Sequence, residues 1–510
     1  MFLIRSFDSF LNRTTMYRLL IYSLSIILIG GFVVSYFDMT SFTIINLAIS
    51  ISLLSGACFV TNLMLSRAFE VPANHESSII TTLILACIVQ PPETTERMWA
   101  VVLVGIIAMA SKYLLAINRQ HVFNPAAVAV LIVGAAGLLP ATWWIATPTL
   151  APIAAVVGAC ILRKTRHFQL FAVFAIASFL TMTGVGLLNG ESIVSTLSLG
   201  LTSWPIIFFG TIMLTEPITM PSEKSYQGIY AGLVGVLFAS QLSFGPISAS
   251  PQLALVVGNI FAFAINPRGR FILTLQSKRE IAPHIYDFAF ALNERDAATK
   301  FRYPPGQFLD WTLPHVGFDS RGNRRTFTIA SSPTEPVLRL GVKFSDPSSA
   351  YKQTLRDMKV GDTIATSRLS GHFVMPRDTK RPLVFIAGGI GITPFRSMAK
   401  YSIDTETTRD VSLFHLVNTA ADAVYQADFK AAHKVGWAVR YVVREGKLPA
   451  HTKGLIGELT PEILRATCKD VTRSIFYISG PPPMVDHYVA LLKDMGCKRS
   501  QIMTDFFSGY

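Results

Sequence analysis

Long apolar runs separated by short polar stretches fill the first half of the chain. A helix needs about 20 apolar residues to cross a bilayer, and ten runs are candidates, of which the third and eighth are short enough to be broken or re-entrant. The pattern predicts a polytopic α-helical membrane domain over residues 1–266. The candidate spans lie near residues 17–37, 43–66, 77–90, 98–117, 124–139, 147–162, 168–187, 202–215, 226–243 and 251–266.

From residue 267 onward the apolar positions follow a different pattern. Short alternating and aromatic-rich runs, such as residues 270–292, are typical of strands, and they predict an antiparallel β-barrel over residues 267–376. From residue 377 onward, apolar runs alternate with helical stretches. This alternation predicts a domain of the α/β class with a parallel sheet over residues 377–510.

Charge separates the two halves of the chain. Hydrophobic residues make up 51% and charged residues 15% of the whole. Residues 1–265 hold 11 Lys and Arg against 9 Asp and Glu, whereas residues 266–510 hold 34 against 23. The basic residues are scattered rather than clustered, so we expect no nucleic-acid partner. A basic half instead suits a domain beside an anionic cytoplasmic membrane face, where it also attracts anionic dinucleotides.

Positive charge in the loops falls almost entirely on one side of the predicted membrane domain. Cytoplasmic loops carry an excess of Lys and Arg, so we expect both termini in the cytoplasm and the protein in the inner (plasma) membrane. The eighth loop shows this excess of positive charge least clearly, because Glu216 and Glu223 accompany its single Lys224. The basic residues on this side are Arg5, Arg13, Arg18, Arg67, Arg119, Arg163, Lys164, Arg166, Lys224, Arg268 and Arg270.

Cysteine and histidine positions limit the metal chemistry. The five cysteines are never closer than 29 residues, which excludes C-x-x-C zinc sites and the plant-type iron–sulfur run. In the first half, His75, His121 and His167 lie near predicted loops, and no two share a predicted helix. Paired haem ligands inside helices are therefore not expected. We predict no metal site, no haem and no iron–sulfur cluster.

Two proline-containing stretches mark the membrane domain. The first, "RQHVFNPAAVAV", covers Arg119–Val130, and its Asn124 can cap a helix that Pro125 begins. The second, "MLTEPITMP", covers Met213–Pro221 and places Glu216 at a membrane boundary, where acidic residues often line polar sites. A plain helix start and a solvated helix end are the alternative interpretations.

In this order and topology, the two stretches resemble the membrane subunits NqrB and RnfD of the sodium-pumping NADH:quinone oxidoreductase and the Rnf complex. The resemblance covers roughly residues 15–265. It implies ten membrane helices and a bound flavin, FMN or riboflavin, with Asn124, Thr196 and Glu216 as candidate contacts. The family attaches FMN to a threonine in an S-G-A-T-like motif, which is missing here. The nearest stretch, an expected outside loop at 189–200, offers Ser195 and Thr196; the alternative is a flavin that is lost or held without a covalent bond.

A flavin motif lies in the predicted barrel. The stretch "RRTFTIASSP", Arg324–Pro333, resembles the R-x-Y-S-x-x-S motif of the ferredoxin–NADP⁺ reductase family through Arg325, Phe327, Thr328 and Ser331. The resemblance implies that Arg325 makes a forked, charge-assisted contact with the pyrophosphate of FAD. Phe327 would stack on the isoalloxazine, although it lacks the hydroxyl of the usual tyrosine, and Thr328 would hydrogen-bond flavin N5.

Other stretches of this half extend the resemblance. "PPGQFLDW" at Pro304–Trp311 matches the P-G-Q-F strand of the family. The family also often ends with an aromatic residue that covers the flavin, for which Phe507 and Tyr510 are the candidates, a packed tail being the alternative. Further residues that the resemblance places near the flavin and its phosphates are Lys343, Ser348, Ser349 and Gly371.

Two further motifs predict the nicotinamide site. In "VFIAGGIGITP", Val384–Pro394, the glycines allow close backbone approach, and free N–H groups at a helix start favour phosphate. "YISGPPPM", Tyr477–Met484, matches the C-G-P-P-x-M motif of the family with Ser479 in place of cysteine. Thr419 lies where an arginine sometimes reads a 2′-phosphate, which favours NADH over NADPH. The resemblance implies catalytic roles for Thr328, Ser479 and Asp505, the last of which matches an acidic position near the active centre of the family. It also implies NAD(P) contacts by Gly388, Gly389, Gly391, Thr393, Pro394, Gly480, Pro481 and Met484.

These motifs together predict an NAD(P)H-dependent, FAD-containing oxidoreductase embedded in the lipid bilayer. It would take hydride from cytoplasmic NAD(P)H onto FAD and pass electrons into or across the membrane domain. The acceptor would be a flavin, a quinone or an external (periplasmic) flavoprotein. Three alternatives stay open: a redox-driven ion pump of the Nqr/Rnf type, a haem-containing ferric reductase, and a transporter whose reductase domain senses redox state.

Overall fold

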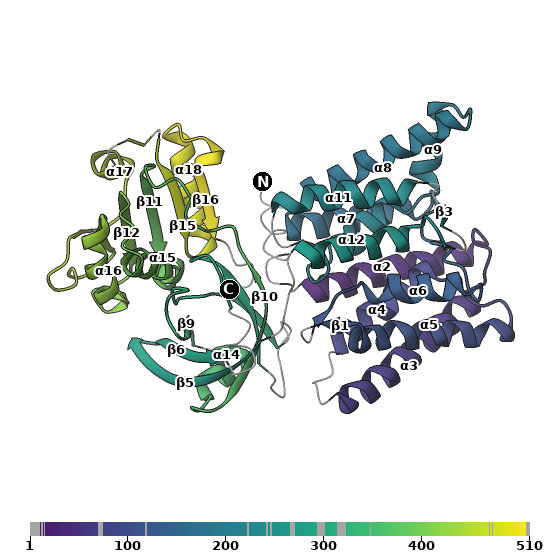
Figure 1. Ribbon diagram of the computed structural model, residues 1–510, viewed down its shortest axis with the longest axis horizontal. Helices are drawn as coiled ribbons and strands as arrows, with labels where there is room; N and C mark the ends of the chain where they lie inside the picture. The colour runs from purple at the N-terminus through teal and green to yellow at the C-terminus, as the bar shows by residue number, and fades with distance from the viewer. Residues whose placement is uncertain are drawn as a thin grey trace. The chain divides into compact units, whose positions relative to one another are not determined.

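The structure is a computed structural model of the 510-residue chain. It divides into two compact units, Met1–Gly269 and Arg270–Tyr510, which Figure 1 shows as a helical unit and a unit of two sheets. The residues that it describes are 11, 14, 16–69, 75–117, 120–221, 224–240, 243–244, 247–265, 271–292, 301–313, 323–346, 348–468, 470–471 and 473–505.

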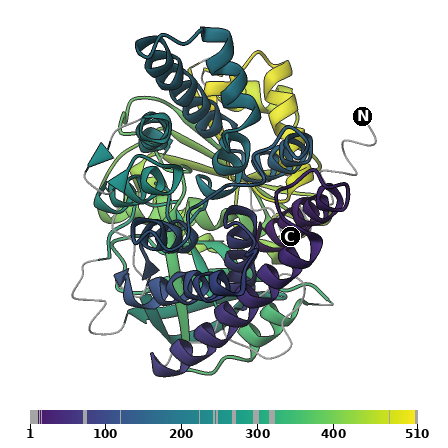
Figure 2. The same ribbon diagram turned by 90° about the vertical axis from the view of Figure 1, so that its right-hand side faces the viewer.

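Helices dominate the first unit (Figures 1 and 2). Asn124 caps α6 by accepting a hydrogen bond from the Ala127 amide, and Pro125 begins the helix, as its sequence predicts. Its helices are α2 (Met16–Tyr36), α3 (Ile44–Ala68), α4 (His75–Ile88), α5 (Thr95–Leu114), α6 (Pro125–Ala135), α7 (Ala151–Thr165), α8 (Phe168–Leu188), α9 (Ile193–Thr202), α10 (Ile206–Phe208) with η1 (Phe209–Met213), α11 (Lys224–Ala239) and α12 (Pro251–Ile265). Short hairpins are formed by β1 (Ala116–Ile117) with β2 (Gln120–His121) and by β3 (Ser243–Phe244) with β4 (Ile247–Ser248).

A helix lies in each of the ten predicted ranges, but several are shorter than a membrane span. By length and composition, 4 helices within the described residues could cross a membrane, or up to 5 if the bent pair at 193–213 is one span. That pair is bent by 61°, in the region where the sequence predicts a short or broken eighth span. The expectation of a loop at 189–200 is wrong, because Ser192 caps α9 and the apolar residues that follow continue as a helix.

Three helices of α2–α6 contact one another in the same order as three helices of α7–α12. In the first set, α3 packs on α5 and α5 packs on α6. In the second set, α8 packs on α11 and α11 packs on α12. A polar residue followed by proline lies just after α4, at Gln90, and just after η1, at Glu216, and another precedes α6, at Asn124, and α12, at Ser250. The separation of Gln90 from Asn124 equals that of Glu216 from Ser250.

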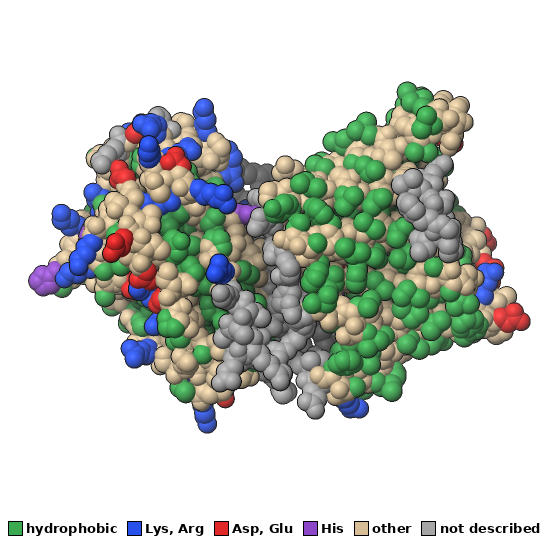
Figure 3. Space-filling model, in the orientation of Figure 1, with side chains coloured by type: hydrophobic (Ala, Val, Ile, Leu, Met, Phe, Trp, Pro, Cys, Tyr) green, Lys and Arg blue, Asp and Glu red, His purple; other side chains and the backbone are tan. Residues whose placement is uncertain are grey.

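Apolar side chains cover the helical unit on the face that Figure 3 shows, whereas charged side chains gather on the other unit. The described helices expose large apolar residues such as Ile29, Leu180 and Leu188. In the second unit, the exposed large hydrophobic residues among those described are Val360 and Ile456. A contiguous exposed apolar surface of this kind marks contact with lipid or another apolar partner.

The second unit begins with a six-stranded antiparallel sheet in the order β8-β7-β10-β5-β6-β9. Its edges approach each other, because the amide of Ala330, just after β8, donates to the carbonyl of Arg339 in β9. The helix α14 (Ala350–Asp357) follows β9. The strands are β5 (Phe271–Ala282), β6 (Ile285–Leu292), β7 (Phe308–Thr312), β8 (Arg324–Thr328), β9 (Leu338–Lys343) and β10 (Thr363–Ser370).

A parallel sheet completes the second unit, in the order β14-β13-β12-β11-β15-β16. The chain starts at the central strand β11, moves outward on one side, and returns to the other side of β11 with β15. Ligands of such sheets bind at the carboxyl ends of strands where the order reverses. The elements are β11 (Leu383–Gly388), η2 (Gly389–Ile392), α15 (Thr393–Asp404), β12 (Val411–Val417), η3 (Ala420–Asp422), α16 (Gln426–Ala432), η4 (His433–Val435), β13 (Trp437–Val443), β14 (Gly454–Ile456), α17 (Pro461–Thr467), β15 (Ile475–Ser479), α18 (Pro482–Asp494), η5 (Arg499–Gln501) and β16 (Ile502–Asp505).

Candidate functional site

Two glycine-containing turns meet at the carboxyl ends of β11 and β15. Ala387 at the end of β11 pairs with Ser479 at the end of β15, so the turns that follow lie side by side. A Cβ atom on Gly480 would lie 3.1 Å from the Cα of Gly388, and one on Gly391 would lie 2.5 Å from the carbonyl oxygen of Ser479. The two predicted NAD(P) motifs are therefore brought together by the fold, and glycine permits their contact.

Residues around the two turns form their walls. Thr393 begins α15, is buried, and its hydroxyl donates to the Ile390 carbonyl; Pro394 follows in the first turn. Pro481 precedes α18, and Met484 closes over Gly388, where an added Cβ would lie 2.4 Å from the methionine sulfur. Gly389 has a φ of +53° with open space around its Cα, a conformation suited to glycine.

His415 contacts the backbone of the first glycine turn, a role that the sequence motifs do not predict. It is fully buried on β12, in register with Ala387. Burial lowers the pKa of His415 to about 4, so the ring is neutral near pH 7. Its Nε2 lies 3.1 Å from the carbonyl oxygen of Gly389, and because a carbonyl can only accept, Nε2 carries the hydrogen.

The flavin motif occupies β8, and its residues divide between the two faces of the strand. Arg325 and Phe327 point to one face, where the Arg325 guanidinium lies 5.0 Å from the centroid of the Tyr351 ring and Phe327 packs against the same ring. Phe327 is only 6% exposed. Thr328 points to the other face, toward the parallel-sheet domain.

The start of α14 lies on the same side as Arg325. Tyr351, which contacts Arg325, belongs to the first turn of this helix. Ser349 caps the helix by accepting a hydrogen bond from the Lys352 amide, and the Ser348 hydroxyl donates to the Ser345 carbonyl. A guanidinium beside a helix N-terminus is a donor set that suits phosphate oxygens.

The two domains of the second unit meet at Thr328 and Asp505. The Thr328 hydroxyl donates to Asp505 Oδ2 over 3.3 Å, and Ser479 pairs with Asp505 in the neighbouring strand. Burial raises the pKa of Asp505 to about 7, although hydrogen bonds from Thr328 and Ser479 oppose this shift. The three predicted catalytic residues therefore form one cluster, in which the carboxyl can hold a proton near neutral pH.

Three other predicted flavin contacts have partners within the protein. Ser331 is fully buried, and its hydroxyl accepts a hydrogen bond from the amide of Arg339. Lys343 forms an ion pair of 3.2 Å with Asp422 in the other domain. Gly371 has a φ of +125°, and its carbonyl accepts a hydrogen bond from Gln307. Phe507 and Tyr510 lie outside the described residues, and direct flavin contact by any of these residues stays a prediction.

The two proline-containing stretches of the helical unit form a polar cluster. Asn124 Nδ2 donates to Glu216 Oε2 over 2.8 Å, and the Thr219 hydroxyl donates to the same oxygen over 3.1 Å. His121 Nε2 lies 3.8 Å from Glu216 Oε1. Asn259 of α12 accepts from the Asn124 amide and donates to the Thr219 carbonyl. The sequence predicts Asn124 and Glu216 here, but not the contribution of Asn259.

Thr196 lies elsewhere, in the first turn of α9. Its side chain is buried, and its hydroxyl donates to Glu191 Oε2 and to the Ser192 carbonyl. The neighbouring Ser195 is exposed, and its hydroxyl donates to the Ser192 carbonyl. A role for Thr196 in flavin attachment stays a prediction. Among the described residues, no group of three or more His, Cys, Asp or Glu side chains is arranged to hold a metal ion.

The strand orders and the meeting motifs define the class of the second unit. An antiparallel sheet that carries a flavin motif is joined to a parallel sheet that carries two glycine turns at its crevice. This arrangement is that of an NAD-binding flavoprotein reductase module of the ferredoxin-reductase type. Reductases of this class depend on FAD and NAD(P).

Comparisons with known proteins agree with this class. Residues 385–490 match the family model described as "Oxidoreductase NAD-binding domain". The chain is 28% identical over 229 residues to a flavohemoprotein of Bacillus thuringiensis subsp. konkukian, covering 43% of this chain and 56% of that protein. It is also 28% identical over 216 residues to the reductase component of propane 2-monooxygenase from Rhodococcus jostii, covering 41% and 56%.

Similarity to a solved structure is weaker. A ferredoxin NADP⁺ reductase from Neisseria gonorrhoeae with bound FAD and NADP aligns with a TM-score of 0.40 and 21% identity, over 46% of this chain and 98% of that chain. The chain spans little more than half the length of the two curated relatives named above.

Proposed function

We propose that the chain is a membrane-bound flavoprotein oxidoreductase that oxidises NADH with FAD and passes the electrons to an acceptor through its helical unit. The observation that carries this proposal is the contact between Thr328 of the flavin strand and Asp505 of the parallel sheet. This contact lies beside Ser479, at the turn where the two glycine motifs touch.

The residues of the antiparallel sheet fit FAD. Arg325 and the start of α14 supply donors for a pyrophosphate. Thr328 places its hydroxyl on the opposite face of β8, where it would donate to the edge of a bound flavin ring in place of Asp505. When bound, FAD accepts a hydride and releases electrons one at a time.

The residues of the parallel sheet fit a nicotinamide dinucleotide. Gly388, Gly391 and Gly480 allow its backbone to approach closely, and α15 starts directly after the first turn. Thr419 lies just after β12, and its amide and hydroxyl both donate to Asp422. A carboxylate at this position favours the ribose hydroxyls of NADH over the 2′-phosphate of NADPH.

Residues around the two glycine turns would prepare the site for hydride transfer from NADH to FAD. Thr393 and Ser479 form buried walls beside the turns and exclude water. Burial lets Asp505 hold a proton near neutral pH, and its Oδ2 keeps the Thr328 hydroxyl in place at the end of β8 by accepting its hydrogen bond. His415 keeps the Gly389 carbonyl fixed without adding charge.

The helical unit is the proposed route to the acceptor. Its exposed apolar residues suit a lipid bilayer, and the polar cluster at Glu216 joins the two stretches that resemble NqrB and RnfD. An ionisable residue among apolar helices is a functional candidate. We propose that this cluster contacts a flavin, FMN or riboflavin, and that a quinone or an external flavoprotein is the final acceptor.

An anaerobic NADH titration of the detergent-purified chain tests the proposal. We expect FAD to be released from the purified protein by denaturation, and NADH to bleach the flavin absorbance without added dye. The matched comparison is a Gly391→Ala variant, which should retain FAD but bleach far more slowly. A wild-type protein that takes up no FAD, or whose flavin NADH fails to reduce, would contradict the proposal.

A further inference from the structure

Arg396 lies in the first turns of α15, the helix that starts directly after the glycine turn of the nicotinamide motif. Its side chain is 6% exposed, which is rare for an arginine unless all its donors are satisfied. Its Nε donates to Asp428 of α16 over 3.0 Å. The two terminal nitrogens point away from α16, to the antiparallel-sheet domain.

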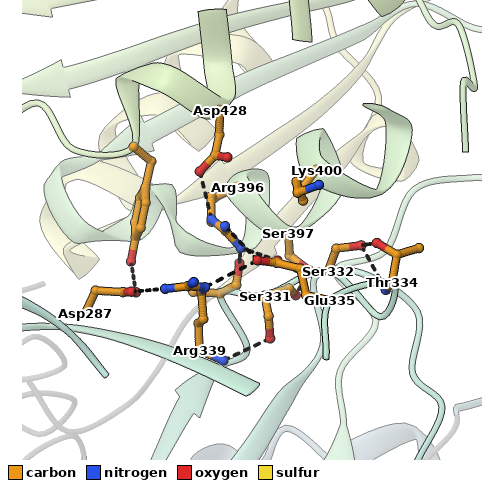
Figure 4. A network of polar contacts seen from close by, with 12 residues as sticks. Asp287, Ser331, Ser332, Thr334, Glu335, Arg339, Arg396, Ser397, Lys400 and Asp428 are labelled. Atoms are coloured by element: carbon orange, nitrogen blue, oxygen red, sulfur yellow. Dashed lines mark hydrogen bonds and ion pairs between the residues drawn. The ribbon is translucent and has the colours of Figure 1, made fainter. Parts of the chain in front are cut away.

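The partners in that domain belong to the end of the flavin motif, at Ala330, and to the segment that follows it, at Glu335 (Figure 4). Arg396 Nη1 donates to the Ala330 carbonyl over 3.0 Å and also to Glu335 Oε2, and Nη2 donates to Glu335 Oε1 over 3.0 Å. The pair is therefore bidentate, a geometry that fixes orientation as well as distance. Ala330 lies two residues after Thr328, so the Arg396 guanidinium contacts the chain just beyond the end of β8.

Other polar contacts extend this link between the two domains. Ser397, the next residue of α15, donates from its hydroxyl to the Ser331 carbonyl. Glu335 also accepts from Nε of Arg339, which pairs with Asp287 of β6. Asp287 in turn accepts a hydrogen bond of 2.9 Å from the hydroxyl of Tyr425, in the parallel-sheet domain. We call Arg396, Glu335, Arg339, Asp287 and Tyr425 the interdomain network.

Charge within the network is nearly balanced. Burial alone would raise the pKa of Glu335, but the hydrogen bonds and charge of Arg396 outweigh burial and lower it. Glu335 is therefore a carboxylate at neutral pH, and its side chain is 10% exposed. Removing Arg396 alone leaves the largely buried Glu335 without its bidentate partner, whereas removing both leaves only Asp428, whose side chain is 25% exposed, without its partner.

We propose that Arg396 is a positioning residue for hydride transfer, which sets the distance between the flavin strand and the nicotinamide turn. The proposal rests on the proposed function. The Arg396 guanidinium holds Ala330, at the end of the flavin motif, against α15, the helix that begins at Thr393. Hydride transfer requires reacting atoms about 3–3.5 Å apart, and a misplacement of about 1 Å can cost about 100-fold in rate.

Anaerobic stopped-flow reduction of FAD by NADH tests this role in Arg396→Met and Arg396→Lys. We expect the Met variant to reduce its FAD about 100-fold more slowly than wild type, with its FAD content and its NADH dissociation constant within about twofold. The Lys variant keeps the positive charge but loses the two-pronged guanidinium contact with Glu335. Its rate of FAD reduction should therefore fall less than that of the Met variant. NADH deuterated at the transferred hydrogen should show a larger isotope effect in both variants, because hydride transfer then limits the rate.

The matched control is Lys400→Met. Lys400 lies further along α15 and pairs with Asp404 at the surface, so the rate should stay at the wild-type value. The double variant Glu335→Gln/Arg396→Met separates positioning from stability, because it removes both charges of the pair. Because the bonds of Arg396 to Asp428 and to the Ala330 carbonyl are still missing, we expect the double variant to regain most, but not all, of the melting temperature that Arg396→Met loses, while its hydride transfer stays slow.

Two results would overturn the proposal: a wild-type rate in Arg396→Met, or a rate that recovers together with the melting temperature in the double variant. Both comparisons use wild-type protein whose FAD is reduced by NADH. Failure of that wild-type reaction would instead contradict the proposed function.

Discussion

At the scale of single residues, Asp505 has the most unusual environment in the candidate site. Its carboxyl is 7% exposed, and its pKa is raised from an ordinary 3.8 to about 7 by burial. The unfolded chain therefore loses this proton at lower pH than the folded chain does. Between about pH 4 and pH 7 the folded state binds more protons, so the free energy of unfolding falls as pH rises through this window.

Replacing Asp505 with asparagine should remove this loss of stability. The Asp505→Asn variant and wild type should be similarly stable near pH 4, whereas near pH 8 the variant should be more stable by up to about 4 kcal/mol. Melting temperatures measured across this range check the prediction. Asp494→Asn, at an exposed position of α18, is the control and should leave the pH dependence unchanged. A wild-type curve parallel to that of Asp505→Asn would contradict the prediction.

Short motifs predict some residues of the site but not those that hold it together. Thr328, Ser479 and Asp505 come from three distant stretches, and the structure brings them into one cluster. Arg396 and Glu335 belong to no motif, because their pairing depends on how two domains pack. Arg396 and Glu335 each lie shortly after one of the motifs. The sequence of these segments alone does not show that the two side chains form an ion pair.

At the scale of elements, the two glycine turns are the parts most sensitive to added volume. A Cβ on Gly388 would meet the end of the flexible Met484 side chain, whereas a Cβ on Gly391 would meet the backbone of Ser479 and Gly480. A side chain can move away, but the backbone at the end of a buried strand cannot do so without breaking the sheet.

The two alanine substitutions should therefore differ in whether a second change can rescue them. Gly388→Ala should weaken NADH binding, and adding Met484→Ala should restore much of it by making room for the new methyl group. Gly391→Ala should slow NADH-dependent turnover severely, with or without Met484→Ala. NADH dissociation constants from flavin fluorescence check this, and rescue of Gly391→Ala by Met484→Ala would show that the clash is elsewhere.

Periodicity predicts the type of most elements but not their lengths. Apolar runs in the first half correspond to helices, yet α6 ends at Ala135, where Gly137 follows with a φ of +70°. The apolar run itself continues past that point, so hydropathy alone places the end too late. Likewise α9 is separated from α10 by Pro205, which cannot continue the hydrogen bonding of the preceding helix.

At the scale of the whole molecule, the two units differ in surface and in proposed surroundings. The helical unit exposes large apolar side chains, and the reductase module exposes charged ones. Basic loop residues fall on one side of the predicted spans, which favours a cytoplasmic position for the module. This orientation stays a prediction that sealed vesicles can test.

Inside-out membrane vesicles should oxidise NADH added to the outside, whereas right-side-out vesicles should do so only after detergent opens them. The reason is that NADH does not cross the bilayer, so activity reports which side holds the glycine turns. Dye reduction measured before and after detergent provides the readout. Activity of intact right-side-out vesicles would place the module on the exterior and contradict the orientation.

The order of the two units along the chain has a consequence for biosynthesis. Domains form in sequence as they leave the ribosome, and every apolar helix of this protein is translated before β16 supplies Asp505. If the helical unit inserts into a membrane as proposed, it does so while the reductase module is still incomplete. The proposed path for electrons would then be in place before the first NADH is consumed, which would limit stray reduction of oxygen during assembly.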